Sequence, residues 1–345
     1  MKAALLRDIG RLEVADVQKP GAPEGGVLIK VGACAICGTD VKVYRHGHRL
    51  IKPPRITGHE IAGTVVEVGG GVEGVQKGDR VAIAPVVSCG SCRPCRQGYT
   101  TMCDNLKAIG YHFDGGFAEF MVVPPEAVRA GCINKVPDGL SVEEAALAEP
   151  LACCINAQEL ARVGLGQTVL VIGAGPIGCL NVQLARALGA VKTILADISP
   201  ARLQMSSFVE PEAMIDLSKE KPAERVKAET DGAGADVVIV ACAAKPALEG
   251  SLALAAKRGT VCFFGGLPKD EPMIAFNAND LHYKELTVVG NHGSTARQNR
   301  LALDLLGSGR VNAAALITHK IKIEEILRGL EITEKGEGLK VIVHS

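Results

Sequence analysis

Short stretches of alternating apolar and polar residues, separated by turn-forming residues, fill the chain from Met1 to about Pro150. Brief alternating runs of this kind are typical of half-buried β-strands in an all-β region. The pattern predicts strands at Val27–Gly32, Ile61–Val68 and Arg80–Ala84, each bounded by Gly, Pro or Asp.

From about Ile155 the pattern changes to compact apolar runs that alternate with longer helical stretches. Compact apolar runs are typical of strands buried on both faces, and their alternation with helices predicts a parallel sheet covered by helices. The predicted strands are Thr168–Ile172, Thr193–Ala196, Asp236–Cys242 and Gly259–Gly265, and the predicted helices are Pro176–Leu188, Thr295–Leu306 and Ile323–Ile332.

The length of 345 residues exceeds the usual size of a single hydrophobic core, so we expect two domains. We expect the first domain to cover residues 1–154 and the second to cover residues 155–294. Residues 295–345 are expected to return to the first domain.

Composition excludes two broad classes of protein. The formal net charge is zero and no long basic run occurs, which argues against a nucleic-acid binder. The apolar stretches are short and interrupted by glycine, so no membrane span is predicted. Nothing at the N-terminus resembles a secretory signal, and we therefore expect a cytoplasmic, reducing environment.

Four cysteines occur close together with the spacing C-x2-C-x2-C-x7-C, at Cys89, Cys92, Cys95 and Cys103. Four thiolates this close suit one tetrahedral ion, and a closed sulfur set favours zinc. A pair of disulfides and a chance cluster are the alternatives, and a reducing compartment argues against disulfides. The spacing therefore predicts a structural zinc site.

A glycine motif, G-A-G-P-I-G, occupies residues 173–178, directly after one predicted strand and at the start of a helix. Gly173 allows a tight turn, Gly175 lets the backbone approach a pyrophosphate, and Gly178 permits close packing of helix on strand. The helix that begins with Pro176 and Ile177 offers free N–H groups and the positive end of its dipole to phosphates. A purely structural turn is the alternative.

Asp197 follows the next predicted strand, where a carboxylate can accept hydrogen bonds from the hydroxyls of an adenosine ribose. A carboxylate there repels a 2′-phosphate, so the sequence favours NAD over NADP. Arg202 lies five residues further on. It could flank the adenine, or it could bind a 2′-phosphate and weaken the preference for NAD.

The remaining motifs are C-G-T-D at residues 37–40, G-H-E at 58–60, G-G-F-A-E-F at 115–120 and E-P at 149–150. Taken singly, a buried Cys or a core His is the commoner explanation. In this order, with the four cysteines and the glycine motif, they resemble the zinc-containing medium-chain dehydrogenase/reductase family of alcohol, polyol and threonine dehydrogenases. The resemblance covers nearly the whole chain. It implies an α/β protein with a GroES-like β-rich catalytic domain and a Rossmann-type doubly wound sheet.

The resemblance also implies a catalytic zinc. Cys37 and His59 match the family's thiolate and imidazole ligands, and Glu60 can ligate the ion in the polyol branch. Glu149 stands where alcohol dehydrogenases have a second cysteine, as in sorbitol-type enzymes. Two rival ligands follow just beyond it, at Cys153 and Cys154.

The family's mechanism assigns further roles. Zinc lowers the pKa of the substrate alcohol, and hydride passes to the nicotinamide. Asp40 would orient a ligand, and Thr39 would take the hydroxyl proton. Many relatives carry a histidine three residues after that hydroxyl residue, whereas this chain has Lys42. The proton would then leave through the cofactor ribose or through water.

The clue to the nature of the substrate is a basic segment that contains Arg45, His46, His48 and Arg49 and continues to Lys52 and Arg55. A solvated surface loop is the commoner interpretation of such a charge run. The alternative is that one of the first four residues binds an anionic group, which would make the substrate a sugar or polyol phosphate. Tyr111 and His112 either line the substrate pocket or pack locally.

The sequence thus predicts an NAD-dependent zinc dehydrogenase that acts on a polyol or a secondary alcohol. One alternative is an amino-alcohol dehydrogenase of the threonine type, against which E-P in place of D-P argues mildly. The other is a zinc- and nucleotide-binding protein without turnover. The resemblance also implies a homodimer or homotetramer.

Overall fold

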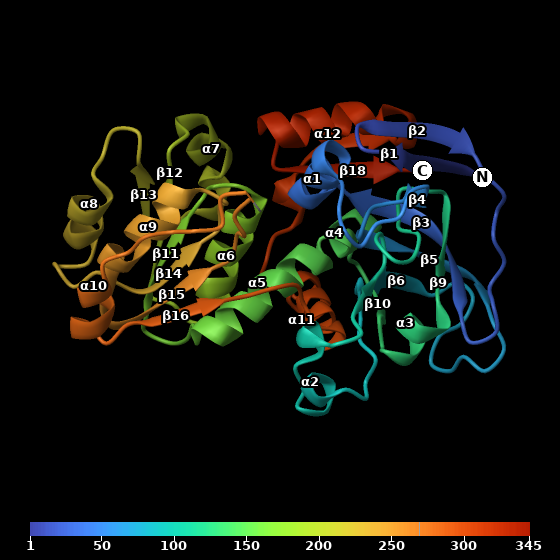
Figure 1. The fold of residues 1–345 in the computed structure, drawn as a ribbon, viewed down its shortest axis with the longest axis horizontal. Helices are drawn as coiled ribbons and strands as arrows, with labels where there is room; N and C mark the ends of the chain where they lie inside the picture. Colours follow the sequence, from blue (N-terminus) through green and yellow to red (C-terminus); the bar gives the residue numbers. More distant parts are fainter. Residues whose placement is uncertain (269) are drawn as a thin grey trace. The chain divides into compact units, whose positions relative to one another are not determined.

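Two structural units make up the chain in the computed structural model, which describes residues 1–268 and 270–345. The first unit combines Met1–Ala152 with Gly293–Ser345, and the second is Cys153–His292. The chain therefore leaves the first unit, builds the second and then returns. In Figure 1 the two parts of the first unit are blue to green and red.

A seven-stranded sheet forms the centre of the first unit (Figure 1). Its strands are β3 (Val27–Ala35), β5 (Glu60–Val68), β6 (Arg80–Ile83), β9 (Phe120–Val123), β10 (Ile133–Lys135), β17 (Ile317–Lys322) and β18 (Lys340–His344). They are hydrogen-bonded in the order β10-β6-β5-β3-β18-β17, and β9 also pairs with β3. The strand β18 therefore enters the sheet beside a strand from the other end of the sequence.

Smaller elements surround this sheet. The other strands are β1 (Lys2–Asp8), β2 (Arg11–Asp16) and β4 (Arg55–Ile56), which form one sheet, and β7 (Val86–Val87) and β8 (Lys107–Ala108), which form another. The α-helices are α1 (Gly38–His46), α2 (Arg93–Arg96), α3 (Pro125–Arg129), α4 (Val142–Ala146), α11 (Ala296–Gly307) and α12 (Ile326–Lys335). The 3₁₀ turns are η1 (Thr100–Met102), η3 (Ala314–Leu316) and η4 (Ile323–Glu325).

The core of the first unit lies on the central strands. Val27, Ile29 and Val31 of β3 are at most 2% exposed, as are Ile61 and Val65 of β5. Burying one such aliphatic side chain stabilises the fold by roughly 1.5–3 kcal/mol. The packing of these side chains therefore fixes the ends of the two strands and positions the residues that follow β3 and precede β5.

The second unit is a six-stranded parallel sheet with helices packed on it (Figure 1). Its strands are β11 (Thr168–Ile172), β12 (Lys192–Asp197), β13 (Ala213–Asp216), β14 (Ala235–Val240), β15 (Ala255–Phe263) and β16 (Thr287–Gly290). Its helices are α6 (Pro176–Ala187), α7 (Pro200–Met205), α8 (Pro222–Glu229), α9 (Lys245–Leu254) and α10 (Ala278–Tyr283), with the 3₁₀ turn η2 (Ser207–Val209). The order β13-β12-β11-β14-β15-β16 reverses direction at β11, as in a doubly wound dinucleotide-binding sheet.

The α/β class predicted from the sequence is confirmed, whereas several boundaries differ. The strand Thr168–Ile172 has the predicted bounds, but β15 begins at Ala255 rather than Gly259. The helix α5 (Ala148–Ala161), which crosses the boundary between the units, was not predicted. Most of its residues are buried, so it lacks the one-sided apolar stripe by which a surface helix is recognised.

No helix among residues 1–268 and 270–345 combines the length and the apolar character needed to cross a membrane.

Candidate active site

The central sheet brings together three ligand-type side chains from separate parts of the sequence. Ala35, near the end of β3, lies opposite Glu60 at the start of β5. Cys37 therefore meets His59 and Glu60, and the ligand atoms of these three residues all lie within 4.8 Å of one another. Thiolate, imidazole and carboxylate are the three ligand types that zinc accepts in proteins. The donor set thus fits a zinc ion.

Asp40 holds two of these residues in place. Its Oδ2 accepts a hydrogen bond from the backbone N–H of Cys37 at 2.9 Å, and its Oδ1 lies 3.4 Å from Nδ1 of His59. Because Nδ1 faces the carboxylate, Nε2 is the nitrogen left to face a metal. Asp40 is 5% exposed, so little water competes for this contact.

Cys37 also caps the helix α1. Its Sγ accepts a hydrogen bond from the backbone N–H of Thr39 at 3.4 Å, and the side-chain Oγ1 of Thr39 lies 3.6 Å from the same sulfur. The sulfur therefore occupies the cap position at the positive end of the dipole of α1. Lys42, one turn further along α1, is exposed.

Glu60 is paired with a lysine that the sequence analysis missed. Lys340 Nζ lies 2.5 Å from both carboxylate oxygens of Glu60, and its second contact is the backbone oxygen of Ile36 at 3.4 Å. The two side chains are 3% and 1% exposed. The signal in the sequence is a single charge inside the apolar run Leu339–Val343, which by itself does not reveal the partner.

Glu149 lies in the first turn of α5 and is buried. It is not part of the group of three, but its charge acts on Glu60 and Lys340. The rival ligands Cys153 and Cys154 belong to the second unit, where Cys154 Sγ lies 3.8 Å from the backbone oxygen of Ile177.

Negative charge dominates the electrostatics of this cluster. Burial disfavours the charged imidazole of His59, yet Asp40 and Tyr111 outweigh burial and leave the pKa of His59 well above its usual value. Burial raises the pKa of Glu60, while Lys340 acts in the opposite direction. Burial and the charge of Asp40 raise the pKa of Cys34, so this neighbouring thiol stays protonated. The negative charge that raises these pKa values also favours a bound cation.

Tyr111 connects the cluster to the basic segment. Its ring lies 5.8 Å from the ring of His59 and 5.1 Å from the ring of His48, measured between centroids. His112, the neighbour of Tyr111, instead accepts a hydrogen bond through Nδ1 from the backbone N–H of Ala108 at 3.1 Å. Of Tyr111 and His112, which were both candidates for lining the substrate pocket, Tyr111 therefore lies beside the ligand cluster.

Two arginines of the basic segment are paired with carboxylates. Arg45 donates to both oxygens of Glu334, at 3.0 and 2.7 Å, and Arg55 donates to Asp114 at 2.9 Å. The side chains of His46, Arg49 and Lys52 are exposed, and His48 is half-buried.

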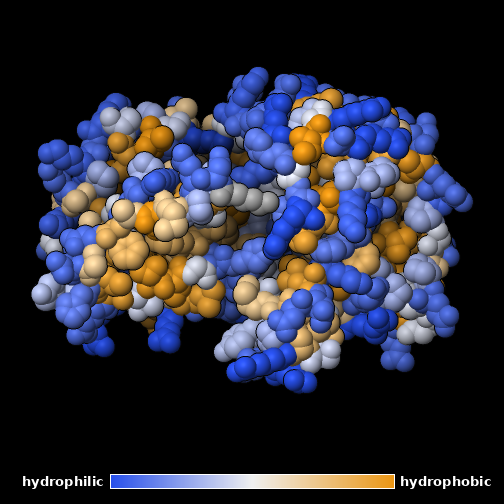
Figure 2. All heavy atoms as spheres, in the orientation of Figure 1, coloured by the Kyte–Doolittle hydropathy of each residue, from blue (hydrophilic) through white to orange (hydrophobic). Residues whose placement is uncertain are grey.

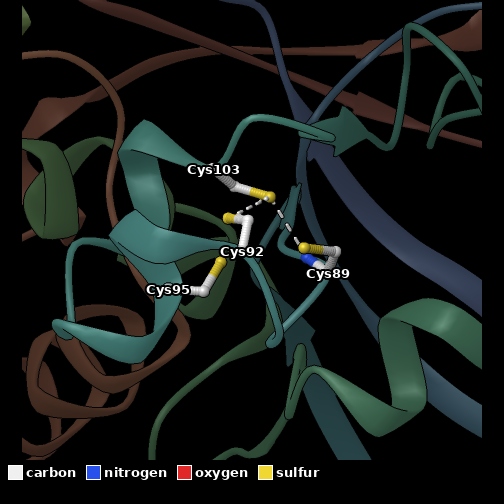
Figure 3. Close-up of side chains that lie close together, drawn as sticks. All are labelled: Cys89, Cys92, Cys95 and Cys103. Atoms are coloured by element: carbon white, nitrogen blue, oxygen red, sulfur yellow. Dashed lines mark hydrogen bonds between the residues drawn. The ribbon is translucent and has the colours of Figure 1, made fainter.

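The four cysteines of the C-x2-C-x2-C-x7-C segment also come together. Their sulfur atoms lie within 4.8 Å of one another and surround one point (Figure 3). Cys92 precedes the short helix α2, Cys95 lies within it, and Cys103 follows η1. All twelve cysteines lie in the described residues and none forms a disulfide there. A tetrahedral zinc ion fits this set of donors.

Hydrogen bonds already favour thiolate at this cluster. The backbone N–H of Cys89 donates to Cys103 Sγ at 3.3 Å (Figure 3). Backbone N–H groups of Ser91 and Cys92 lower the pKa of Cys89 to about 5. Burial and the neighbouring sulfurs raise the pKa of Cys95 to about 12. One cysteine is thus ionised at neutral pH, and a cation would favour ionisation of the rest.

The glycine motif forms the turn between β11 and α6 in the second unit. Gly173 has a φ of +113°, a conformation that favours glycine. A Cβ at Gly178 would lie 1.8 Å from the backbone oxygen of Gly173, whereas one at Gly175 would meet no atom within 4 Å. Pro176 and Ile177 form the first turn of α6. The turn therefore packs closely on one side and leaves Gly175 open.

Asp197 ends β12 and closes this turn. Its two oxygens accept hydrogen bonds from the backbone N–H groups of Ala174, at 2.7 Å, and Ser199, at 2.8 Å. Arg202 follows in the first turn of α7, and its charge acts on Cys179. The carboxylate is thus fixed beside the glycine turn at the carboxyl end of the sheet, where such sheets bind ligands.

Two family models match the chain. Residues 23–137 match the alcohol dehydrogenase GroES-like domain, and residues 176–308 match the zinc-binding dehydrogenase domain. The L-threonine 3-dehydrogenase of Pyrococcus abyssi is 39% identical over 95% of this chain and 92% of its own length.

Further similarity is found in a fungal enzyme and in a solved structure. A probable D-xylulose reductase A of Aspergillus clavatus is 34% identical over 92% of this chain and 88% of its own. A zinc-binding dehydrogenase from Sinorhizobium meliloti, crystallised with NADP, superposes with a TM-score of 0.92 at 34% identity. That match covers 100% of this chain and 99% of the other. The chain belongs to the zinc-containing alcohol dehydrogenase family of oxidoreductases, and the resemblance noted in its motifs is confirmed.

Proposed function

We propose that this protein is a zinc-dependent dehydrogenase that oxidises the secondary hydroxyl of a polyol or related alcohol, with NAD as hydride acceptor. The grouping of Cys37, His59 and Glu60 around one point carries the proposal. When bound, zinc lowers the pKa of an alcohol as a Lewis acid, and the nicotinamide accepts hydride.

Each residue of the cluster has a role in this scheme. Cys37 and His59 would hold the ion, and Asp40 would fix the direction of both. Lys340 pairs with the carboxylate of Glu60, and we propose Glu149, which matches the family's E-P motif, as a further ligand. Thr39 would accept the proton of the substrate hydroxyl.

The fixed carboxylate of Asp197 supports NAD rather than NADP. A ribose with two hydroxyls can donate to it, whereas a 2′-phosphate would be repelled by its charge. The S. meliloti relative binds NADP, so the preference needs a direct test. We expect kcat/KM to be higher with NAD⁺ than with NADP⁺, and Asp197→Ser to reduce that ratio.

Oxidation of an amino alcohol is a second candidate, because the P. abyssi relative is an L-threonine 3-dehydrogenase. A screen of NAD⁺ reduction with xylitol, 2,3-butanediol, 2-butanol and L-threonine, together with zinc per chain, separates the candidates. Two zinc ions and the highest kcat/KM for a polyol support the lead proposal. A highest kcat/KM for threonine supports the second candidate. One zinc ion per chain and no turnover would support a zinc- and nucleotide-binding protein without enzymatic activity.

We also propose that two copies of the chain associate through the edge strand β16. Among the described strands β16 pairs only with β15, which leaves its other edge open. Figure 2 shows apolar residues on the face of the second unit, and the exposed apolar side chains in β16 and in the segment before it include Met273, Phe276, Tyr283 and Val288. An open apolar edge is a site for strand pairing between copies. Light scattering should give at least a dimer, whereas a monomer at micromolar concentration would refute the proposal.

None of the twelve cysteines forms a disulfide in the described residues, which supports a reducing compartment, and we propose the cytoplasm as the site of the reaction.

A further inference from the structure

The G-G-F-A-E-F motif begins with three residues that bind the chain segment just before His59. Their backbone N–H groups donate to three backbone carbonyl groups of that segment. The bonds run from Gly115 to Ile56 at 2.8 Å, from Gly116 to Gly58 at 3.0 Å and from Phe117 to Thr57 at 3.1 Å. The backbone of the motif thus holds the backbone that leads to a proposed zinc ligand.

The carbonyl oxygen of Gly58 is closely surrounded by other glycines. A Cβ at Gly115 would lie 2.1 Å from this oxygen, and a Cβ at Gly110 would lie 2.8 Å from it, so neither position has room for a side chain. The carbonyl group of Gly58 and the N–H of His59 belong to one planar peptide unit. Holding this oxygen in place therefore also holds the backbone from which His59 extends.

The α-carbon of Gly58 is packed just as closely. Its φ of +90° lies in the region that favours glycine. A Cβ at this position would lie 2.8 Å from Sγ of Cys34 and 2.9 Å from Cγ of Phe117. Cys34 belongs to β3, the strand that leads to Cys37. The residue before His59 is therefore enclosed between that strand and the ring of the motif's phenylalanine.

Asp114, the residue before the motif, adds a side-chain contact to the same segment. Its Oδ1 accepts hydrogen bonds from Nη1 of Arg55 at 2.9 Å and from the backbone N–H of Ile56 at 3.2 Å. The side chain of Asp114 is 55% exposed, whereas His59 is buried. Asp114 therefore acts on the segment before His59 from the protein surface, and replacing it does not open the core.

His59 is thus constrained through both its ring and its backbone. Oδ1 of Asp40 lies 3.4 Å from Nδ1 of the ring, and residues 114–117 hold the preceding backbone. Zinc sites keep their metal–ligand distances to within about 0.2 Å. A methyl group at Gly115 would push the oxygen of Gly58 away by about 0.9 Å to reach a separation of 3.0 Å. A displacement of this size is larger than a zinc site accepts.

We propose that residues 114–117 are a positioning element for the zinc site, which sets the distance of His59 from Cys37 through contacts with residues 55–58. This inference rests on the zinc site of the proposed function. The four residues touch neither the ion nor the substrate in this scheme. They maintain the affinity for the ion by keeping the imidazole within reach of the thiolate.

The test measures the affinity of the full-length chain for the zinc ion at Cys37 and His59, by competition with a chelator. Gly115→Ala should raise its dissociation constant roughly 10–100-fold, the usual effect of losing a residue that orients a metal ligand. The four-cysteine site should keep its zinc ion. Co²⁺ bound in place of the weakened zinc should show an altered visible absorption spectrum, which a loss of stability alone would not produce.

Gly69→Ala is the matched control. A Cβ at Gly69 would lie 1.9 Å from the backbone oxygen of Pro23, so the clash is at least as severe as at Gly115. Gly69 lies in the same unit but follows the end of β5 that is opposite Glu60. This variant should also lower the midpoint of thermal unfolding, while both zinc affinities stay within about twofold of wild type.

Asp114→Ala provides a second test, which remains available if Gly115→Ala does not fold. It should raise the dissociation constant of the same zinc ion about fivefold, the effect of about one hydrogen bond. Asp79→Ala is its control, because Asp79 likewise accepts from a backbone N–H, that of Gln76, and from a cation, Lys135, both at 2.9 Å. This control should leave the zinc affinity unchanged.

The outcomes separate this inference from the proposed function. If the zinc affinity of the tested variants stays within about twofold of wild type, or if the controls weaken it equally, residues 114–117 only stabilise the fold and the inference is wrong. Two zinc ions in a wild-type protein without turnover would contradict the proposed oxidation alone. One zinc ion per wild-type chain, held by the four cysteines, would overturn both.

Discussion

The buried ion pair between Lys340 and Glu60 provides the most direct test of how the first unit is held together. In the substitution Lys340→Met the methylene groups are largely kept and the ammonium group is lost. The carboxylate of Glu60, 1% exposed in its side chain, then remains buried without its cation. Removing one partner of a buried ion pair typically costs about 3–5 kcal/mol. We therefore expect a loss of this size in the free energy of opening of the central sheet.

Hydrogen exchange measured by mass spectrometry can detect this loss within one unit of a two-unit chain. Peptides that cover β3 and β18 should exchange roughly a thousandfold faster in Lys340→Met, which corresponds to about 4 kcal/mol. The double variant Glu60→Gln/Lys340→Met should recover part of the loss, because it carries no unpaired charge. A global unfolding curve is less suitable, since two units need not unfold in one step.

Lys320→Met is the matched control. Lys320 lies in the neighbouring strand β17 and pairs with Glu143 at 3.0 Å, but its side chain is 56% exposed. An exposed pair contributes at most about 1 kcal/mol, so exchange should rise by no more than about fivefold. If Lys340→Met costs no more than Lys320→Met, or if the double variant is no more stable than Lys340→Met, the argument from burial is refuted.

Three other outcomes are expected. Cys92→Ser should reduce zinc from two ions to one per chain and lower the midpoint of thermal unfolding, and two retained ions would contradict the four-cysteine site. Gly178→Ala should weaken NAD⁺ binding at least tenfold, because its Cβ would lie 1.8 Å from the oxygen of Gly173; Gly250→Ala, where a Cβ meets no atom within 4 Å, should bind normally. Lys192 and Arg225 lower the pKa of Glu229, although burial acts in the opposite direction. The ionised carboxylate therefore stabilises the fold at neutral pH. This stabilisation is lost as the pH falls through the lowered pKa. Glu229→Gln should therefore lower the free energy of unfolding by less than about 1 kcal/mol at pH 7 and should not change it in acid. Urea unfolding measures this difference, and a loss that increases as the pH falls would contradict the expected pH dependence.

The sequence predicted those features whose information is local. The strand Thr168–Ile172 and the α/β class follow from the spacing of apolar residues, and the family follows from motifs in a fixed order. The approach of Cys37 to His59 depends on the register of β3 with β5. Motif resemblance suggested this proximity, whereas periodicity could not.

Contacts between distant segments were beyond the reach of sequence patterns. The basic segment appeared as one charged surface, but Arg45 is bound to a residue 289 positions away and Arg55 to one 59 positions away. Lys340 and Glu60 are 280 positions apart. Both members of such a pair look like ordinary charges until the fold places them together.

The insertion of β18 next to β3 has a consequence for protein synthesis. At roughly 5–20 residues per second, the ribosome makes Glu60 many seconds before Lys340, which follows 280 positions later. The whole of Cys153–His292 is translated in that interval and can fold as a continuous segment. During this time β3 lacks its neighbour β18, and Glu60 lacks its cation. The nascent chain is therefore most vulnerable to misassociation in the unit that carries the proposed zinc ligands.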